Sequence, residues 1–400
     1  MNTAERDVLA IWAASGAMAL TGPPDRPLGP PAPLVPRMVE LGRRFEERSA
    51  TLGRRVELDP VALLGERAAI ARLTRRGQVS VGGATRLLPT ADGWVAVTLA
   101  RPDDVDLLPA WLGLDLDADV RTRHDPWPAV SDAVRQRSSR DLDSQGALLG
   151  LPIGALPPGG REPVTSSVGT EPLPCRATRV GDAAPRIDLR DITVVDLSSL
   201  WSGPLCGSLL ALAGAQVTKV ESTTRPDGAR NGPPEFFSLM NAGKSGATVD
   251  LPTPAGTDAL RELIAHADVV IEGSRPRALA QLGIDATDTV QRDGLKVWVS
   301  ITAHGRDGDG SNRVGFGDDA AVAGGLVAWH DDEPYFCADA VADPTTGLVA
   351  AVACLDALAV GGAWLLDVAL ANVAAHLAGP TLEPPGSLAV APPRARLVSS

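Results

Sequence analysis

The second half of the chain alternates short, continuously apolar runs with helical patterns, and this alternation constrains the fold more than any other feature. Apolar runs suited to buried strands occupy residues 192–197, 217–221, 247–251, 268–272 and 296–302. Helical patterns lie between several of these runs, at about 205–213, 254–266 and 276–282. Strands that are apolar on both faces and alternate with helices are typical of parallel sheets. The fold class predicted is therefore α/β, with a Rossmann-like, doubly wound parallel sheet.

The first half of the chain has a different pattern and predicts a second, smaller α+β domain. A Pro- and Gly-rich loop at 22–36 leads into helical periodicity over 37–75. Alternating residues between 78 and 111 predict short strands with a hairpin turn at 91–93, and residues 131–155 return to helix. The predicted division is a helical segment packing on the large domain (1–75), a small α+β domain (76–165), a linker (166–187) and a Rossmann-like domain (188–400).

Composition limits the partners that this chain is expected to bind. A net charge of −12 argues against nucleic acid, which is bound through clustered basic residues. The four cysteines show no CxxC spacing, which indicates reduced thiols in the cytoplasm and gives no metal motif. The most apolar stretch, 347–366, is interrupted by Asp356 and two glycines, so no membrane span is predicted. The dinucleotide fingerprint GxGxxG is absent, so neither nicotinamide nor flavin is expected.

A series of motifs in the second half resembles the CaiB/BaiF, or class III, CoA-transferases. The series runs in family order through most of residues 190–375, from VVDLSSLWSGPLCGSLLALAGAQVTKVE to ADPTTGLVAAVACLDAL and WLLDVAL. Segment 10–22 resembles the family's mid-chain segment, which usually precedes the catalytic aspartate. Segments 82–97 and 147–158 resemble its small domain, which is normally found near the C-terminus. The resemblance therefore implies circularly permuted halves. The alternative is two incomplete copies that are completed by partner chains.

The resemblance implies a reaction and a nucleophile. Family members move CoA between an acyl-CoA and a carboxylic acid through anhydride and thioester intermediates on an aspartate. Asp343, followed by Gly347 four residues later, fits the family's spacing. Asp followed by Pro is also an ordinary N-cap and first-turn pair of a helix, and the two interpretations are compatible. A helix N-terminus favours an ionised carboxylate.

The resemblance also implies a CoA-binding site at the ends of the predicted strands, where parallel sheets bind ligands. The candidate CoA-binding residues are Trp201, Ser202, Gly203, Lys219, Arg230, Lys244, Gly273, Ser274 and Arg275. The basic members are equally suited to solvated surface. Ser222 and Ser245 stand where the family usually has arginine, which weakens the expected phosphate contacts. The turn at Gly82 and Gly83 is either the family's glycine turn over the intermediate or a plain hairpin.

Two other functions are open. The first is an acyl-CoA racemase or epimerase, which in the related enzymes uses a His–Asp pair. Residues 315–321 offer Asp318 and Asp319 but no histidine, and His304 is a lone loop histidine, so racemisation is disfavoured. The second is a non-catalytic subunit of a heteromeric CoA-transferase. The resemblance implies either a homodimer, in the family an interlocked one, or a heteromer with a related subunit.

Overall fold

The main sheet of the computed structural model has seven strands. The structure describes residues 2–114, 125–169, 171–185, 188–292 and 295–396. In spatial order the strands are β6 (Arg176–Gly181), β14 (Ala363–Ala369), β11 (Val297–Thr302), β10 (Val269–Glu272), β7 (Thr193–Asp196), β8 (Gln216–Ser222) and β9 (Ser245–Val249). Only β6 runs antiparallel to its neighbour, while the other adjacent pairs are parallel. The predicted α/β class is confirmed.

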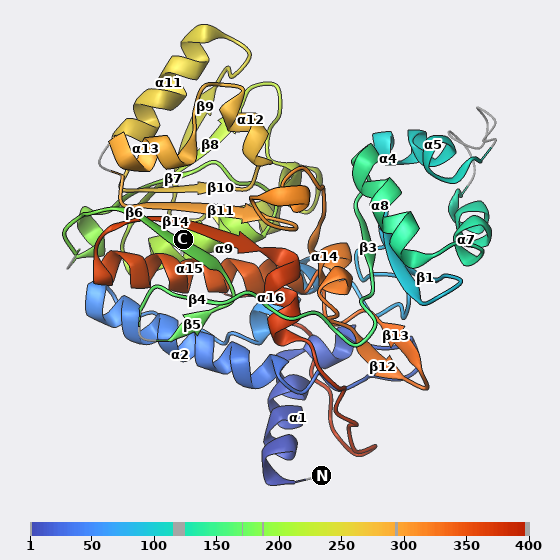
Figure 1. The fold of residues 1–400 in the computed structure, drawn as a ribbon. Helices are drawn as coiled ribbons and strands as arrows, with labels where there is room; N and C mark the ends of the chain where they lie inside the picture. Colours follow the sequence, from blue (N-terminus) through green and yellow to red (C-terminus); the bar gives the residue numbers. More distant parts are fainter. Residues whose placement is uncertain (1, 115–124, 170, 186–187, 293–294, 397–400) are drawn as a thin grey trace.

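Helices cover both faces of this sheet, as a doubly wound fold requires (Figure 1). The inner face packs on α9 (Ser202–Ala213) and α15 (Ala342–Val360) in the larger apolar core. The outer face packs on α11 (Pro254–Ala265) and α13 (Ala286–Arg292), beside the short α12 (Pro276–Ala280). The Thr253 hydroxyl accepts from Gly256 N at 3.1 Å and Pro254 opens α11, so the cap and first turn form where Thr-Pro predicts.

Helix α15 lies at the centre of the molecule, between α9, α2 (Leu34–Leu52) and strands β11 and β14. It is long and apolar enough to cross a membrane by length and composition, but most of it is buried in this core. At Gly347 a Cβ atom would lie 2.7 Å from the Ser202 carbonyl oxygen and 3.0 Å from Leu205 Cβ. The glycine therefore permits the close approach of α15 to α9.

The first segment of the chain wraps around α15 from the side opposite the sheet (Figure 1). It consists of α1 (Thr3–Ser15), η1 (Ala17–Leu20), α2, η2 (Ala62–Gly65) and α3 (Glu66–Ala71). Arg44 and Arg48 of α2 both pair with Asp356, a fully buried carboxylate of α15. Near the other end of the chain, Ala391 N donates to the Ala13 carbonyl at 2.9 Å.

The small lobe has its own sheet and its own core. The strands β1 (Thr85–Pro89), β2 (Trp94–Thr98) and β3 (Ile153–Ala155) pair antiparallel. The helices around them, among the residues that the structure describes, are α4 (Pro102–Asp106), α5 (Leu108–Leu112), α7 (Trp127–Arg135) and α8 (Ser139–Leu149). The predicted hairpin is closed by Thr90 N donating to the Gly93 carbonyl at 2.8 Å. Residues 153–155, predicted as helix, instead form β3, because they complete the small sheet beside β2.

The segment predicted as a linker, 166–187, contains β4 (Ser166–Ser167), β5 (Pro172–Leu173) and β6. The domain boundaries and the permuted order of the halves remain predictions.

The remaining described elements are η3 (Leu189–Asp191), η4 (Gly228–Asn231), α10 (Pro234–Asn241), η5 (Gly308–Gly310), α14 (Gly317–Ala323), β12 (Ala328–His330), β13 (Glu333–Tyr335) and α16 (Leu370–Leu377).

The strand order places a topological switch point between β7 and β10. From β7 the chain continues outward on one side to β8 and β9, and then returns to the other side of β7 to form β10 and β11. In open parallel sheets, ligands bind outside the carboxyl ends of the strands at such a point. The loops that follow β7 and β10 are therefore where a site is expected.

Candidate active site

Asp343 lies in the first turn of α15 and is partly exposed. The Ser202 hydroxyl donates to Asp343 Oδ1 at 2.8 Å and lies 3.0 Å from the Asp343 carbonyl oxygen. Since Ser202 is the first residue of α9, this contact joins the N-termini of the two inner helices. The helix begins earlier than the Asp-Pro pair suggests, because Val341 is the N-cap residue and Asp343 lies inside the helix. The simple cap interpretation of Asp343 is therefore wrong.

The environment of Asp343 changes its acidity. Burial raises the pKa of this carboxyl to about 6, while the hydrogen bond from Ser202 and the charge of Arg67 act in the opposite direction. Asp339 adds a smaller upward contribution to the pKa. A group with a pKa of about 6 is ionised in about nine molecules out of ten at pH 7. At neutral pH, Asp343 is therefore a carboxylate that is poorly solvated, which is suited to nucleophilic attack.

Two glycines allow the close approaches on which this geometry depends. At Gly317, the first residue of α14, a Cβ atom would lie 2.4 Å from Asp343 Oδ2. At Gly203 a Cβ atom would lie 2.1 Å from the hydroxyl oxygen of Ser198, in the loop that follows β7. A larger side chain at position 317 would displace the Asp343 carboxylate, and one at position 203 would displace Ser198 in the loop beside it, so both positions require glycine.

Further carboxyl groups lie near Asp343. Burial raises the pKa of Asp318 to about 7; Arg67 lowers it, while Asp339 and Asp343 raise it further. Burial also raises the pKa of Asp319 to about 7, and its Oδ1 accepts from Phe316 N at 2.9 Å and from the Thr98 hydroxyl at 3.0 Å.

The positive charge of Arg67 partly compensates the negative charges of the carboxyl groups around Asp343. Arg67, in the first turn of α3, donates from Nε to Asp339 Oδ2 at 2.9 Å and from Nη2 to Asp339 Oδ1. Its guanidinium carbon lies 5.4 Å from the centroid of the Trp201 ring. Arg67 and Asp339 are site residues that the sequence interpretation missed. Gly82 lies beside them, since a Cβ atom there would be 3.1 Å from Arg67 Nη2.

The loops at the switch point touch each other. Leu197 N donates to the Ile271 carbonyl at 2.8 Å, and a Cβ atom at Gly273 would lie 3.4 Å from Ser198 Cβ. Leu200 has a φ of 72°, in the left-handed region, and its backbone N donates to Asp227 Oδ1 at 2.9 Å. The structure therefore brings together the predicted loop at 200–204 and the predicted residues after β10.

Two of the predicted basic residues lie inside the protein. Lys219 Nζ is 2.8 Å from Asp227 Oδ2 and donates to the Ser198 carbonyl. Lys244 Nζ donates at 2.8 Å to both Asp196 Oδ2 and the Pro204 carbonyl. Both ammonium groups are buried, and they hold the loop that follows β7 from beneath rather than facing solvent.

The other predicted basic residues lie on the surface. Arg230 pairs with Glu221 through two hydrogen bonds of 2.9 and 2.6 Å. Arg275, beside Ser274 at the N-cap of α12, is exposed. Its pKa is lowered by partial burial and then by the nearby charges of three further arginines: Arg277, Arg101 and Arg225. Arginines from α12, the loop after β8 and the small lobe therefore gather near the switch point.

Trp201 and His304 are engaged in packing. Trp201 is 2% exposed and stacks edge-on against Phe236, with ring centroids 5.3 Å apart. Burial and the charges of nearby arginines lower the pKa of His304 to about 3. A histidine this weakly basic accepts protons poorly at neutral pH, which argues against a general-base role.

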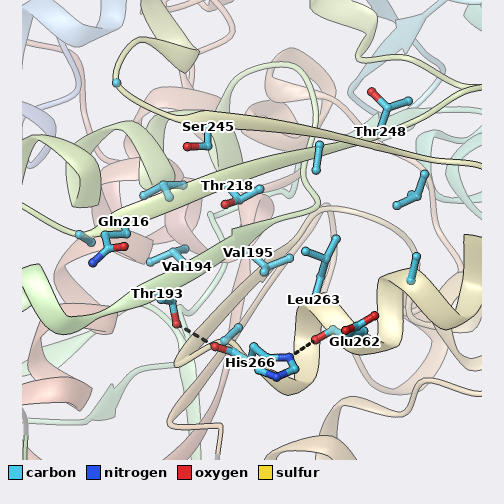
Figure 2. A pocket seen from close by; sticks show the side chains of 17 residues that line it. Thr193, Val194, Val195, Gln216, Thr218, Ser245, Thr248, Glu262, Leu263 and His266 are labelled. Atoms are coloured by element: carbon cyan, nitrogen blue, oxygen red, sulfur yellow. Dashed lines mark hydrogen bonds between the residues drawn. The ribbon is translucent and has the colours of Figure 1, made fainter.

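A pocket of about 760 Å³ lies elsewhere, between α11 and the outer face of β7, β8 and β9 (Figure 2). Its labelled polar residues include Thr193, Gln216, Thr218 and Ser245. Thr193 donates to the carbonyl of His266 at 3.0 Å at its rim. Asp343 is on the opposite side of the sheet, so this pocket is separate from the candidate active site. Among the described residues, no group of His, Cys, Asp and Glu is arranged to hold a metal ion.

The fold and the site together define a class of protein: a doubly wound α/β protein with a poised carboxylate near its switch point. Comparison with known proteins names the family. The model of CoA-transferase family III matches residues 189–394, more than half of the chain. The chain belongs to CoA-transferase family III.

Individual relatives match about half of their own length. A succinyl-CoA–D-citramalate CoA-transferase of Chloroflexus aurantiacus is 29% identical over 44% of this chain and 46% of its own. A succinate–glutarate CoA-transferase of Agrobacterium fabrum is 32% identical over 46% of this chain and 51% of its own. The crystal structure of a CaiB/BaiF family protein from Brucella suis is 32% identical over 47% of this chain and 54% of its own, with a TM-score of 0.44. The chain thus spans about half the length of the curated relatives it matches.

Proposed function

We propose that this protein transfers CoA from an acyl-CoA to a carboxylic acid, with the Asp343 carboxylate as the acyl acceptor. The observation that carries the proposal is the contact between Asp343 and Ser202, which places a poorly solvated carboxylate beside the loop that follows β7. Family membership supports the reaction class, and the topological switch point supports ligand binding at this place. The proposed class is a family III CoA-transferase.

The reaction proceeds in balanced steps. The Asp343 carboxylate attacks the thioester carbonyl, forming a C–O bond and releasing CoA thiolate to leave a mixed anhydride. The thiolate attacks the aspartyl carbonyl and releases the donor acid, which gives an aspartyl-CoA thioester. The acceptor acid then reverses both steps and regenerates the Asp343 carboxylate. No net proton is consumed, and the N-termini of α9 and α15 favour the negative charges that develop.

CoA binding is proposed at the loops of the switch point. The residues Ser202 and Gly203 flank the thioester, with the buried Trp201 packed behind them, and Gly273, Ser274 and Arg275 lie on the other side. The exposed arginines around Arg275 suit phosphate groups because guanidinium groups bind phosphate in a planar, charge-assisted geometry. Lys219 and Lys244 act through the loop that they hold, and Arg230 lies further out. Succinyl-CoA and glutarate, named in relatives, are the first substrates to test.

The test is to trap the acylated aspartate. Purified protein is incubated with succinyl-CoA and then treated with hydroxylamine or borohydride, and the peptides are analysed by mass spectrometry. We expect modification at Asp343 in the native protein, none in Asp343→Asn, and full modification in the control Asp258→Asn, which changes an exposed carboxylate on α11. Unmodified native protein, or an active Asp343→Asn variant, would falsify the proposal.

A second candidate role is a non-catalytic subunit of a heteromeric CoA-transferase. It is supported by a relative of Chloroflexus aurantiacus, 29% identical over 35% of this chain, that is named as the beta subunit of a succinyl-CoA–L-malate CoA-transferase. It predicts no turnover by the isolated chain and activity after addition of a related polypeptide. Light scattering of the purified protein tests the proposed homodimer. The four free, buried cysteines suit the proposed cytoplasmic location.

A further inference from the structure

The pairing of Arg67 with Asp339 leaves one edge of the guanidinium group free. Nε and Nη2 both donate to the two oxygens of Asp339. Within the described residues, Nη1 has no hydrogen-bond partner, and the Arg67 side chain is 30% exposed. Arg67 is therefore held in one orientation by Asp339 while still offering a donor to an incoming group.

The arrangement around Asp339 is one that stability alone does not favour. Asp339 is fully buried, and removing a carboxylate from water is costly even when it is paired. Its neighbours Ala338 and Ala340 have φ values of 53° and 43°, in the left-handed region that disfavours residues with a Cβ atom. Such conformations lower stability, and they concentrate at functional sites. Four residues further along the chain is Asp343.

Contacts connect Arg67 to the proposed nucleophile from two directions. The guanidinium lies over the Trp201 ring, and the next residue, Ser202, donates to Asp343. On the other side, Asp339 precedes Asp343 at the start of α15. The charge of Arg67 also acts on both Asp318 and Asp343. Arg67 is therefore a cation close enough for its charge to act on the reacting carboxylate.

The acid substrate faces an electrostatic difficulty at this site. In the proposed reaction the carboxylate of the acid substrate must approach the aspartyl-CoA formed on Asp343, in a region that already contains the carboxyl groups of Asp318 and Asp339. Like charges in a poorly solvated site repel one another strongly. A fixed guanidinium with a free edge counteracts this repulsion and can bind a carboxylate oxygen.

We propose that Arg67 is the binding residue for the carboxylate of the acid substrate, with Asp339 as its positioning residue. The proposal rests on the proposed CoA-transferase function. In the second half of the reaction, one oxygen of the acceptor acid attacks the aspartyl-CoA carbonyl, forming a C–O bond while the C–S bond breaks and CoA thiolate leaves. Arg67 Nη1 holds the other oxygen of the acceptor. The thiolate then attacks the acyl carbon of the anhydride and returns Asp343 to its carboxylate form.

The experiment compares Arg67→Ala and Arg67→Lys with the native protein, using succinyl-CoA and glutarate. Loss of a charge-assisted hydrogen bond predicts that the KM for glutarate rises about 10- to 100-fold in Arg67→Ala. Arg67→Lys, which keeps the charge but not the planar fork, is expected to fall in between. Added guanidinium ion is expected to restore part of the lost activity of Arg67→Ala. Acylation of Asp343 by succinyl-CoA is expected to persist in both variants.

The matched control is Arg86→Ala. Arg86 has a similar exposure, 32%, and also lies over a tryptophan ring, that of Trp127 in the small lobe. We expect its KM for glutarate to equal that of the native protein.

An unchanged KM for glutarate in a folded Arg67→Ala protein would overturn the inference. Where Arg67→Ala does not fold, the KM of Arg67→Lys decides in the same way. Absence of Asp343 acylation in the native protein would instead refute the proposed function, so the two failures are distinguishable.

Discussion

Replacing Ser202 by alanine tests whether the hydroxyl of that residue sets the acidity of the proposed nucleophile. The hydroxyl donates to Asp343 Oδ1 at 2.8 Å, which favours the ionised form and lowers its pKa against the effect of burial. A hydrogen bond to a charged group contributes about 1.5–3 kcal/mol. Asp343 is partly exposed, so we take the lower end, which corresponds to about one pKa unit. The pKa of Asp343 is therefore expected to rise from about 6 to about 7.

The shift has a defined signature in a pH profile. Only ionised Asp343 attacks, so acylation rises with pH through the pKa and is lost as pH falls below it. At pH 6 the ionised fraction falls from about one half to about one tenth in Ser202→Ala, a roughly fivefold loss of rate. At pH 8.5 both proteins are ionised and their rates converge. The assay is rapid-quench acylation by succinyl-CoA between pH 5 and 9 at constant ionic strength.

The control for this experiment is Ser208→Ala, which removes a buried hydroxyl from the same helix, α9, away from Asp343. Its profile is expected to keep the native midpoint. The reasoning is wrong if Ser202→Ala keeps the native midpoint, or if its rate falls by the same factor at every pH. The second result would mean that Ser202 contributes to alignment without affecting ionisation.

Two further predictions concern packing around α15. Arg44→Ala leaves the buried Asp356 with a weaker counter-charge, so the free energy of unfolding, measured by denaturant titration, is expected to fall by about 3–5 kcal/mol. The control Arg43→Ala breaks only exposed ion pairs and is expected to change the free energy of unfolding by less than about 1 kcal/mol. Equal effects would contradict the assigned burial. Gly347→Ala forces α15 away from α9. It is expected to lower the free energy of unfolding by about 1–3 kcal/mol and to slow acylation of Asp343. The control Gly93→Ala, with open space around its Cβ position, is expected to do neither. A fully active Gly347→Ala protein would refute the close approach.

Most of the large domain was predictable because its signals are local. Apolar runs such as 268–272 and 296–302 are short but rich in valine and isoleucine, so the local sequence already indicates strands. Strand β6 was missed because its residues are mostly partly or fully exposed and read as linker. They become a strand only by adding antiparallel to the edge of β14, which local sequence does not encode.

The site was predictable in part for the same reason. Asp343 and the loop around Ser202 each sit in a recognisable motif, and α9 packing on α15 brings them together. Arg67 had no such signal. It lies in a helical run rich in arginines, and its partner Asp339 is 272 residues away in sequence, so only the folded chain distinguishes it from a surface charge. Lys219 and Lys244 are the opposite case: the sequence suggested ligand contacts that the structure does not support. Their positions match basic residues of the family, but the fold buries both side chains in ion pairs with aspartates.

The three lysines of this chain have a practical consequence for chemical labelling. Lys219, Lys244 and Lys296 are all paired with aspartates, and their side chains are 4%, 1% and 13% exposed. Reagents that acylate side-chain amines, including crosslinkers and fluorescent active esters, therefore find few accessible targets on the native surface. Reaction at Lys244 would require the α9 and β7 region to open, so the rate of its modification reports directly on the opening of the loop beside Asp343.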